Sequence, residues 1–424
     1  MQTAVDELTT KARAAKKAAR EVARLSGQVK DRALLNIADS LKSRQEEVLR
    51  ANEKDYEAGR RDGLSEALLD RLLLTPDRLE GVAADVRNVV TLPDPVGEVL
   101  DMRTMPNGLQ VGRRRVPLGV IGAIYESRPN VTVDISVLCL KSGNAILLRG
   151  GKESVHSNTI LAGLIKEAIS EAGMPSDAVQ IIESTDRALV GRMLKAKEYI
   201  DLIIPRGGQE LIRRVAEEAA MPAITGGIGV CHTYVDRSAA VDMAVNIVFN
   251  AKVQRPSVCN AMDTMIVHSA IAPKYLPRIA ERFVEADVEM RCDPRALSVI
   301  GPMNGVRAVP ATEEDWSTEY LSLTAGVRVV DSFDEALDHI ERYGSGHSDA
   351  IVTEDYAAAM RFLNEVDSSA VFVNASTRFN DGAEFGLGAE VAISTDKYHA
   401  RGPMGLRELT SYKWTVIGGG HIRQ

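Results

Sequence analysis

The sequence predicts an α/β fold in which helices cover parallel β-sheets, because strand-length apolar runs alternate with stretches of helical periodicity. Four such runs lie at 119–125, 145–149, 179–182 and 200–204. Strands that are apolar along their whole length are typical of parallel sheets buried on both faces. With 424 residues, 45% hydrophobic and 26% charged, the chain can form two or three domains with cores of their own.

Helices are expected before the first of these strands. Apolar side chains recur at helical spacing over 3–60, which predicts two long amphipathic helices, and a further helical pattern over 65–90 stops and restarts at Thr75-Pro-Asp77. Between 99 and 116, two short strand-like runs flank Pro106-Asn-Gly108, a sequence typical of the turn of a β-hairpin. This hairpin has no place in the parallel sheet, so we expect it to project.

A second alternating region begins after a domain boundary that we place at 223–229. Its strand-like runs lie at 264–268, 327–330, 350–353 and 371–373. No internal repeat and no low-complexity linker is visible in the sequence. The expected architecture is therefore two α/β domains and a small β element.

Charge and composition favour a protein that acts on a small molecule. The net charge is −8, and acidic and basic residues are interleaved along the chain, so we expect no nucleic-acid surface and no membrane-binding face. The N-terminus has no apolar signal segment, and no later stretch reaches 18 uncharged apolar residues, which predicts a cytoplasmic location. The four cysteines lie far apart without a CxxC pair, which indicates a reducing compartment and no metal site.

Cys259 is the candidate nucleophile. It lies in the polar segment 250–260, between an apolar helical pattern and a strand-like run, and Lys252 and Arg255 precede it. Nearby cations favour the thiolate, which is the reactive form of cysteine. The alternative is that this thiol is a small buried apolar group, as most cysteine thiols are.

Two turns are candidates for a cofactor site, although the GxGxxG and GxxxxGK[ST] phosphate-binding sequences are both absent. Arg206-Gly207-Gly208 follows an apolar run and precedes a helix, where small residues let a phosphate reach the backbone N–H groups of the helix start. Arg149-Gly-Gly-Lys152 places two cations around two glycines, which suits an adenosine 2′-phosphate. Each sequence is also compatible with an ordinary turn.

Five segments in chain order carry distinctive motifs. They are Gly119-Val-Ile-Gly-Ala-Ile-Tyr-Glu-Ser-Arg-Pro-Asn130, Ile224-Thr-Gly-Gly-Ile-Gly-Val-Cys-His232, Lys252-Val-Gln-Arg-Pro-Ser-Val-Cys-Asn260, Tyr343-Gly-Ser-Gly-His-Ser-Asp-Ala-Ile351 and His399-Ala-Arg-Gly-Pro-Met-Gly-Leu406. With them, nearly the whole chain, from about residue 4 to residue 417, resembles the gamma-glutamyl phosphate reductases, a branch of the aldehyde dehydrogenase superfamily.

The resemblance implies an aldehyde-dehydrogenase-like architecture. It assigns 1–98 and 116–228 to a Rossmann-type NADPH-binding domain, 229–400 to an α/β catalytic domain, and 99–115 and 401–424 to an oligomerisation hairpin and C-terminal segment. A homo-oligomer, either a dimer or a tetramer, is expected on the same grounds.

The resemblance also implies a reaction, the NADPH-dependent reduction of L-glutamyl 5-phosphate to L-glutamate 5-semialdehyde and phosphate in proline biosynthesis. Cys259 would attack the acyl phosphate, phosphate would leave, and the resulting thioester would accept hydride from NADPH. The substrate could be handed over by a glutamate 5-kinase.

Individual residues take expected roles from the family positions that they match. Glu319 matches the glutamate that contacts the nicotinamide ribose, and Asn130 is the candidate for the oxyanion-stabilising asparagine. Lys152 replaces an acid that would repel a 2′-phosphate, so that with Arg149 it favours NADPH over NADH. Ile224 stands where hydrolytic members have their general base, and without that base water is not activated to destroy the thioester.

The phosphate and the α-carboxylate of such a substrate need polar and cationic partners. Asn374 and Arg378 lie where substrate-anchoring residues of the superfamily occur, although each is equally explained as an ordinary loop residue. His347 either contacts the phosphate or caps and packs a turn. The cationic candidates, which the sequence does not assign to one group or the other, are Arg255, Arg128, Lys252 and Arg401.

Two other functions stay open. One is a thiol-dependent aldehyde dehydrogenase that oxidises a semialdehyde to the acid with water, and Ile224 counts against it. The other is a cysteine hydrolase or acyltransferase without a nicotinamide, in which Cys259 would pair with one of the seven histidines.

Overall fold

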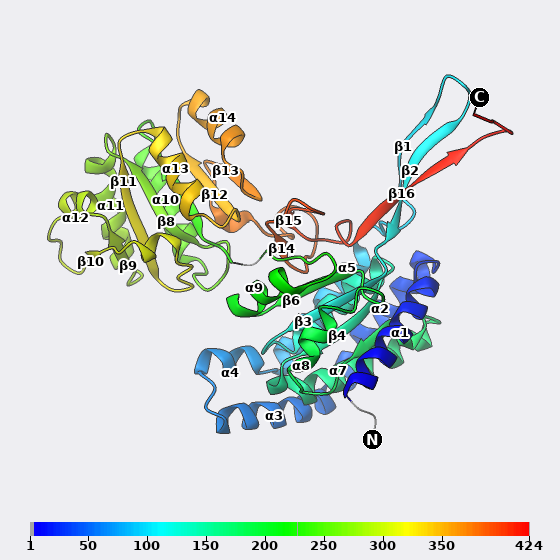
Figure 1. Cartoon of the computed structure of the whole chain (residues 1–424). Coiled ribbons are helices and arrows are strands. Elements are labelled where there is room, and N and C mark those ends of the chain that lie inside the picture. Colours follow the sequence, from blue (N-terminus) through cyan, green and yellow to red (C-terminus); the bar gives the residue numbers. More distant parts are fainter. Residues whose placement is uncertain (1–3, 227, 424) are drawn as a thin grey trace. The chain divides into compact units, whose positions relative to one another are not determined.

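The computed structural model describes residues 4–226 and 228–423, which divide into two compact units (Figure 1). Unit 1 contains the chain up to Thr225, together with Gly386–Ala392 and the stretch from Met404 onward. Unit 2 contains Gly226–Phe385 and Ile393–Pro403. The stretch Gly386–Ala392, which the sequence assigned to the second domain, therefore packs with the first.

The sheet of unit 1 has four parallel strands. They are β3 (Val120–Tyr125), β4 (Ala145–Gly150), β5 (Val179–Ile181) and β6 (Leu202–Arg206), in the order β5-β4-β3-β6. From β3 the chain proceeds outward to β4 and β5 and then returns to place β6 on the other side of β3. The carboxyl ends of β3 and β6 thus flank the point where the strand order reverses, which is where open α/β sheets bind ligands.

The helices of unit 1 pack around this sheet. They are α1 (Ala4–Val22), α2 (Gly27–Ser43), α3 (Gln45–Arg61), α4 (Glu66–Leu72), α5 (Pro76–Thr91), α6 (Asn130–Lys141), α7 (Val155–Glu171), α8 (Ala188–Met193) and α9 (Gln209–Glu218), with the short 3₁₀ helices η1 (Lys152–Ser154) and η2 (Ser176–Ala178).

The expectation of two helices over 3–60 was wrong, because the described part of this stretch forms three. The additional break lies at Arg44, which follows the end of α2 and precedes α3. Ser26 caps α2, since its side chain accepts a hydrogen bond from the backbone N–H of Val29. The predicted interruption near residue 75 is confirmed. The Thr75 side chain accepts from Arg78 N at 3.2 Å, and Pro76 occupies the first turn of α5.

A separate antiparallel sheet in unit 1 confirms the predicted hairpin. It joins β1 (Val99–Thr104), β2 (Gln110–Pro117) and the C-terminal strand β16 (Thr410–Ile417), in the order β1-β2-β16. Along β16 the side chains from Ser411 to Lys413 and beyond are largely exposed, among them those of Tyr412, Trp414 and Val416. Figure 1 shows this ribbon projecting from the rest of unit 1.

Asn144 joins the C-terminal stretch to the start of the parallel sheet. Its Oδ1 accepts from Gly119 N at 2.8 Å, and its Nδ2 donates to Leu409 O at 2.8 Å and to Ser142 Oγ at 2.9 Å. The amide is fully buried, so each of these bonds satisfies a polar group that water cannot reach. The base of the ribbon is therefore fixed to the parallel sheet by one side chain.

Unit 2 is built on a seven-stranded parallel sheet in the order β10-β9-β11-β8-β7-β12-β13. Its strands are β7 (Cys231–Val235), β8 (Met262–His268), β9 (Glu289–Cys292), β10 (Arg307–Pro310), β11 (Thr324–Val330), β12 (Ser348–Val352) and β13 (Ala370–Val373). A two-stranded antiparallel pair, β14 (Ile393–Ser394) and β15 (Gly402–Pro403), belongs to the same unit.

Helices cover both faces of this sheet. They are α10 (Val241–Val253), α11 (Ala272–Val284), α12 (Pro294–Ile300), α13 (Phe333–Tyr343) and α14 (Tyr356–Glu365), with η3 (Glu314–Ser317) and η4 (Thr377–Phe379). Neighbouring residues of β8 enter opposite cores: Met265 and Val267 pack with residues of α10 and α11, and Ile266 packs with residues of α13 and α14. This alternation follows from the two-residue period of a strand.

No helix within 4–226 or 228–423 is both long enough and apolar enough to span a membrane.

Candidate active site and cofactor site

Cys259 lies in an irregular segment between the end of α10 at Val253 and the start of β8 at Met262. It is partly exposed, whereas the other three cysteines, Cys139, Cys231 and Cys292, are buried. Burial raises the pKa of each of those three thiols, so they stay protonated at neutral pH. Exposure thus singles out Cys259 as the thiol that a substrate can reach.

Asn260 anchors the chain directly after this cysteine. Its backbone carbonyl accepts from Thr377 Oγ1 at 2.7 Å, and its Nδ2 donates to the carbonyl of Asn380 at 3.0 Å. Its Oδ1 accepts from the guanidinium of Arg378. The side chain of Asn260 is therefore hydrogen-bonded to η4 and to Asn380, the residue that follows it. Sequence reasoning missed this anchor.

Gly229 closes the other side of the loop. A Cβ atom at this position would lie 1.6 Å from the carbonyl oxygen of Cys259, so no residue with a side chain fits. The backbone N–H of Gly229 donates to Glu319 Oε1 at 2.9 Å. Glu319 is therefore held next to the segment that packs on Cys259.

Two of the predicted cations lie beside the thiol. Arg378 donates through Nε to Gln254 Oε1 at 2.8 Å. Burial and the charge of Arg255 lower the pKa of Arg378, and a thiolate at Cys259 acts in the opposite direction. Arg378 therefore lies within electrostatic range of Arg255 and Cys259, and the acids Asp381 and Glu384 act on it as well.

Lys252 is not available to a substrate at this surface, contrary to the sequence-based expectation. The side chain is fully buried, with Nζ 3.7 Å from Asp263 Oδ1 and 3.3 Å from the carbonyl of Ser322. The ammonium also lies 5.7 Å from the centre of the Tyr320 ring. Burial lowers the pKa of Lys252, and Asp263 acts against this effect. The charge of Lys252 therefore interacts with Asp263 and Tyr320 in the interior of unit 2.

His347 is also buried, contrary to the expectation of a contact with phosphate. Its Nδ1 lies 2.7 Å from Ser348 Oγ and 3.8 Å from Cys231 Sγ. Burial lowers the pKa of His347 to about 4, so the imidazole is neutral at neutral pH. Of the two sequence readings of this histidine, the structure matches the packed turn.

Asn374 and Arg401 are likewise engaged within unit 2. The amide of Asn374 accepts from Thr353 N and donates to Thr353 O, both at 2.9 Å, and its φ of 54° is left-handed. The guanidinium of Arg401 pairs with Asp367 Oδ1 at 2.6 Å. In this structure Asn374 holds the end of β13 against the end of β12, and Arg401 shares the carboxylate of Asp367 with Lys397.

In unit 1 the candidate cofactor residues gather at one edge of the sheet. The strand register places Tyr125 opposite both Gly150 and Arg206, so the three strands end level with one another. Gly207 and Gly208 follow β6 and precede α9. Gly208 has open space where a side chain would be.

The N-terminus of α9 holds a carboxylate of the chain itself. Glu126 Oε2 accepts from the backbone N–H of Gly208 at 3.1 Å, and a Cβ at Gly207 would lie 2.4 Å from the same oxygen. The helix start binds an anionic group in this structure, and that group is the chain's own carboxylate. Glu126 was not predicted from the sequence.

Arg149 is a buried cation at the same edge. Its side chain is 7% exposed, and its Nε has no hydrogen-bond partner within the part of the chain that the structure describes. Burial lowers the pKa of Arg149, whereas the charge of Glu153 raises it. Lys152 is exposed, with Nζ 3.9 Å from Asp62 Oδ2. A buried guanidinium with an unused donor, next to an exposed ammonium and glycine turns, fits a phosphate-bearing cofactor.

Asn130 is directed to its own helix. It begins α6, and its Nδ2 donates to Asp134 Oδ2 at 2.8 Å. Burial raises the pKa of Asp134 to about 7. The structure therefore gives no separate support to Asn130 as an oxyanion donor. Arg128, two residues before, is half-buried in the turn that leads into α6.

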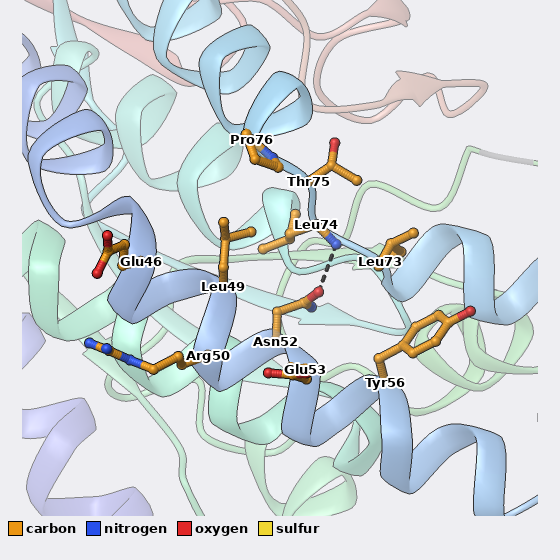
Figure 2. Close-up of a pocket in the computed structure, with 10 residues that line it drawn as sticks. All are labelled: Glu46, Leu49, Arg50, Asn52, Glu53, Tyr56, Leu73, Leu74, Thr75 and Pro76. Carbon is orange, nitrogen blue, oxygen red and sulfur yellow. Dashed lines mark hydrogen bonds between the residues drawn. The ribbon is translucent and has the colours of Figure 1, made fainter.

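A cavity of about 600 Å³ lies elsewhere in unit 1, between α3 and the segment 73–76 (Figure 2). Asn52 lies on this side of α3, but its Oδ1 accepts from Leu74 N at 2.7 Å and its Nδ2 donates to Leu72 O and Ser157 Oγ. The amide therefore serves the fold. None of the predicted site residues lines this cavity, which is bounded by Glu46, Leu49, Arg50, Asn52, Glu53, Tyr56, Leu73, Leu74, Thr75 and Pro76.

Comparison with known proteins agrees with this arrangement. The model of the aldehyde dehydrogenase family matches residues 2–315. A gamma-glutamyl phosphate reductase of Dehalococcoides mccartyi (strain CBDB1) is 57% identical over 423 residues, which cover 100% of both chains. One of Roseiflexus castenholzii is 55% identical over 425 residues, covering 99% of this chain and 100% of the relative.

The crystal structure of the gamma-glutamyl phosphate reductase from Thermotoga maritima has a TM-score of 0.96 to this chain. The two are 46% identical in sequence, and the match covers 99% of this chain and 100% of the other. The chain therefore belongs to the aldehyde dehydrogenase family, and within it to the gamma-glutamyl phosphate reductases.

Proposed function

We propose that this protein reduces L-glutamyl 5-phosphate to L-glutamate 5-semialdehyde and phosphate, with NADPH as reductant and Cys259 as covalent nucleophile. The proposal rests on one observation above others: a single partly exposed thiol on an anchored loop beside two arginines. The chain that carries it is 57% identical over its full length to a protein of that name.

The proposed reaction begins at the thiol of Cys259. The Cys259 thiolate attacks the acyl carbon, the bond from that carbon to the phosphate oxygen breaks, and inorganic phosphate leaves. A bound nicotinamide cofactor would supply a hydride to the resulting thioester. Arg255 and Arg378 would attract the dianionic phosphate, and the backbone N–H of Cys259 is the proposed donor to the oxyanion that forms on the substrate.

Several groups of the chain would hold the cofactor. In unit 1, Arg149, Lys152 and Arg206 supply positive charge, and a phosphate bound at the start of α9 would displace the Glu126 carboxylate from Gly208 N. The aldehyde dehydrogenase family implies a nicotinamide cofactor. The choice of NADPH is our proposal and rests on the two cations Arg149 and Lys152.

Of the two other functions considered, the hydrolase without a nicotinamide has little support. Membership of the aldehyde dehydrogenase family argues against it. Such a hydrolase would need a histidine beside Cys259, whereas His347 is buried and lies next to a different cysteine, Cys231. The hydrolytic aldehyde dehydrogenase differs from the proposed reductase in its need for a base that activates water. Ile224, at the matching position, is buried and apolar.

Replacing Cys259 by Ala is expected to abolish reduction, because no other thiol of this chain is exposed. We expect kcat/KM to fall by at least about a thousandfold, and Cys259 to be the first cysteine that iodoacetamide alkylates. Cys139→Ala, which removes a buried thiol in unit 1, is the matched control. Substantial activity in Cys259→Ala would rule out the thioester.

Replacing Lys152 by Glu is expected to weaken NADPH selectively. The reversed charge costs about 1–3 kcal/mol against a 2′-phosphate, which is roughly tenfold or more in Kd, while NADH loses less. Fluorescence titration of both cofactors measures the two constants. Lys197→Glu, on an exposed turn of unit 1, controls for the change in net charge. Equal losses for NADPH and NADH would show that Lys152 does not face the 2′-phosphate.

The apolar Ile224 leads to a prediction for the reverse reaction. Oxidation of glutamate semialdehyde by NADP leaves a thioester on Cys259, which phosphate must release if no base activates water. Steady turnover should therefore require phosphate or arsenate, and without them at most one NADPH should form per active site. Sustained turnover in phosphate-free buffer would instead assign the chain to the hydrolytic enzymes.

We also propose that the protein is a homo-oligomer. The strand β16 is an edge strand of the three-stranded sheet, and its exposed Tyr412, Trp414, Val416 and Ile417 form an unusual amount of apolar surface for a free edge. Sedimentation equilibrium at micromolar concentration should give a mass of at least twice the 46.0 kDa of one chain. A purely monomeric protein would contradict the proposal. Deletion of the stretch from 410 onward should shift the equilibrium toward monomer.

A further inference from the structure

A second cysteine contacts the backbone of the first. Cys231 begins β7, is fully buried, and lies with its Sγ 3.1 Å from the carbonyl oxygen of Cys259, to which the thiol donates. Gly229, two residues earlier, packs its backbone on the same carbonyl. Gly229 and Cys231 therefore both contact the peptide group that joins Cys259 to Asn260.

The donor itself is held firmly. The pairing of β7 with β8 shifts register between Cys231 and His232, which leaves Asp263 as the extra residue of a β-bulge. The carboxylate of Asp263 accepts from Cys231 N at 3.3 Å and from Tyr320 N at 3.1 Å. Bulges re-aim side chains next to functional sites, and this one fixes the start of β7.

The surroundings of Cys231 keep its proton on the sulfur. Burial, followed by the charges of Asp263 and Asp349, raises the pKa of this thiol well above its ordinary value. The pKa of the nearby His347 is lowered to about 4, so its imidazole is too weak a base to take the proton from this thiol. A thiol that stays protonated stays a hydrogen-bond donor.

We propose that Cys231 is a positioning residue for Cys259: its S–H···O=C bond fixes the peptide group after the nucleophile, and with it the direction of the Cys259 thiol and N–H. This inference rests on the proposed role of Cys259 as nucleophile. The loop has little regular structure of its own, with one turn bond from Ala261 N to Val258 O at 3.1 Å. External contacts must therefore define the position of the sulfur, and small errors in position are costly to catalysis.

Three variants test the proposal. Cys231→Ala removes the donor, and Cys231→Ser keeps a donor at nearly the same place. Cys292→Ala removes a buried thiol from β9 of the same sheet, which is separated from β7 by β11 and β8, and so controls for the loss of packing. For each, we would measure kcat and KM in the phosphate-dependent oxidation of glutamate semialdehyde, the thermal midpoint, and the rate of Cys259 alkylation by iodoacetamide as a function of pH.

We expect Cys231→Ala to lower kcat by about tenfold with little change in KM, and to change the rate and pH profile of Cys259 alkylation. Cys231→Ser should recover most of the loss. Cys292→Ala should lose a similar amount of thermal stability and keep both kcat and the alkylation profile of the parent protein.

Two results would overturn the inference. One is a Cys231→Ala protein with the kcat and alkylation profile of Cys292→Ala, and the other is a Cys231→Ser protein as impaired as Cys231→Ala although both are folded. Failure of the proposed function looks different, because the parent protein itself would then lack phosphate-dependent activity. The alkylation profile remains informative in that case, since it needs no turnover.

Discussion

The close approach of the Gly229 backbone to the carbonyl of Cys259 is the constraint on which the thiol site depends. At 1.6 Å from the place of a Cβ atom, this carbonyl excludes every side chain except hydrogen. Glycine normally weakens a segment because it has most conformational freedom to lose. Here the loss is offset by hydrogen bonds on both sides of the contact, from Gly229 N to Glu319 and from Cys231 to the same carbonyl.

Both sites use irregular chain segments supported by parallel strands, and in both the surrounding residues are held by hydrogen bonds or by strand pairing. In unit 2 the backbone and side chain of Asn260 are fully engaged, so that the cysteine before it can remain accessible. In unit 1 Arg149 lies among strands whose ends are level, with an Nε that has no partner among the residues described. Rigid support around the reactive or binding group is what preorganisation requires.

Much of the fold could be predicted because apolar runs and turn sequences are local signals. The four strands of the unit 1 sheet, four of the seven strands of the unit 2 sheet, the hairpin at Pro106-Asn-Gly108 and the break near Thr75 all follow from short stretches of sequence. The strands β7, β9 and β10 were not predicted. The position of Cys259 on a polar loop could also be predicted. What could not be predicted is which way a side chain turns, since this depends on partners distant in sequence.

Lys252 and His347 illustrate this limit. A lysine seven residues before a cysteine looks like a cation for the substrate, but Asp263 and the ring of Tyr320 make burial tolerable. Glu126 illustrates the limit in a different way. From the sequence alone, an acid next to a predicted phosphate site would count against that site. In the structure its carboxylate occupies the N-terminus of α9 through Gly208.

The local distribution of charge matters more than its sum. With a net charge of −8, the chain as a whole would repel both an acyl phosphate and a dinucleotide. Yet Arg255 and Arg378 lie near the thiol. Asp263, the acid that pairs with the buried Lys252, is itself buried in unit 2. Screening at physiological salt weakens the field of acids farther away than about 8 Å, whereas Arg378 is close enough to the thiol for the two charges to act on each other. An acidic protein can therefore present a cationic site to an anionic substrate.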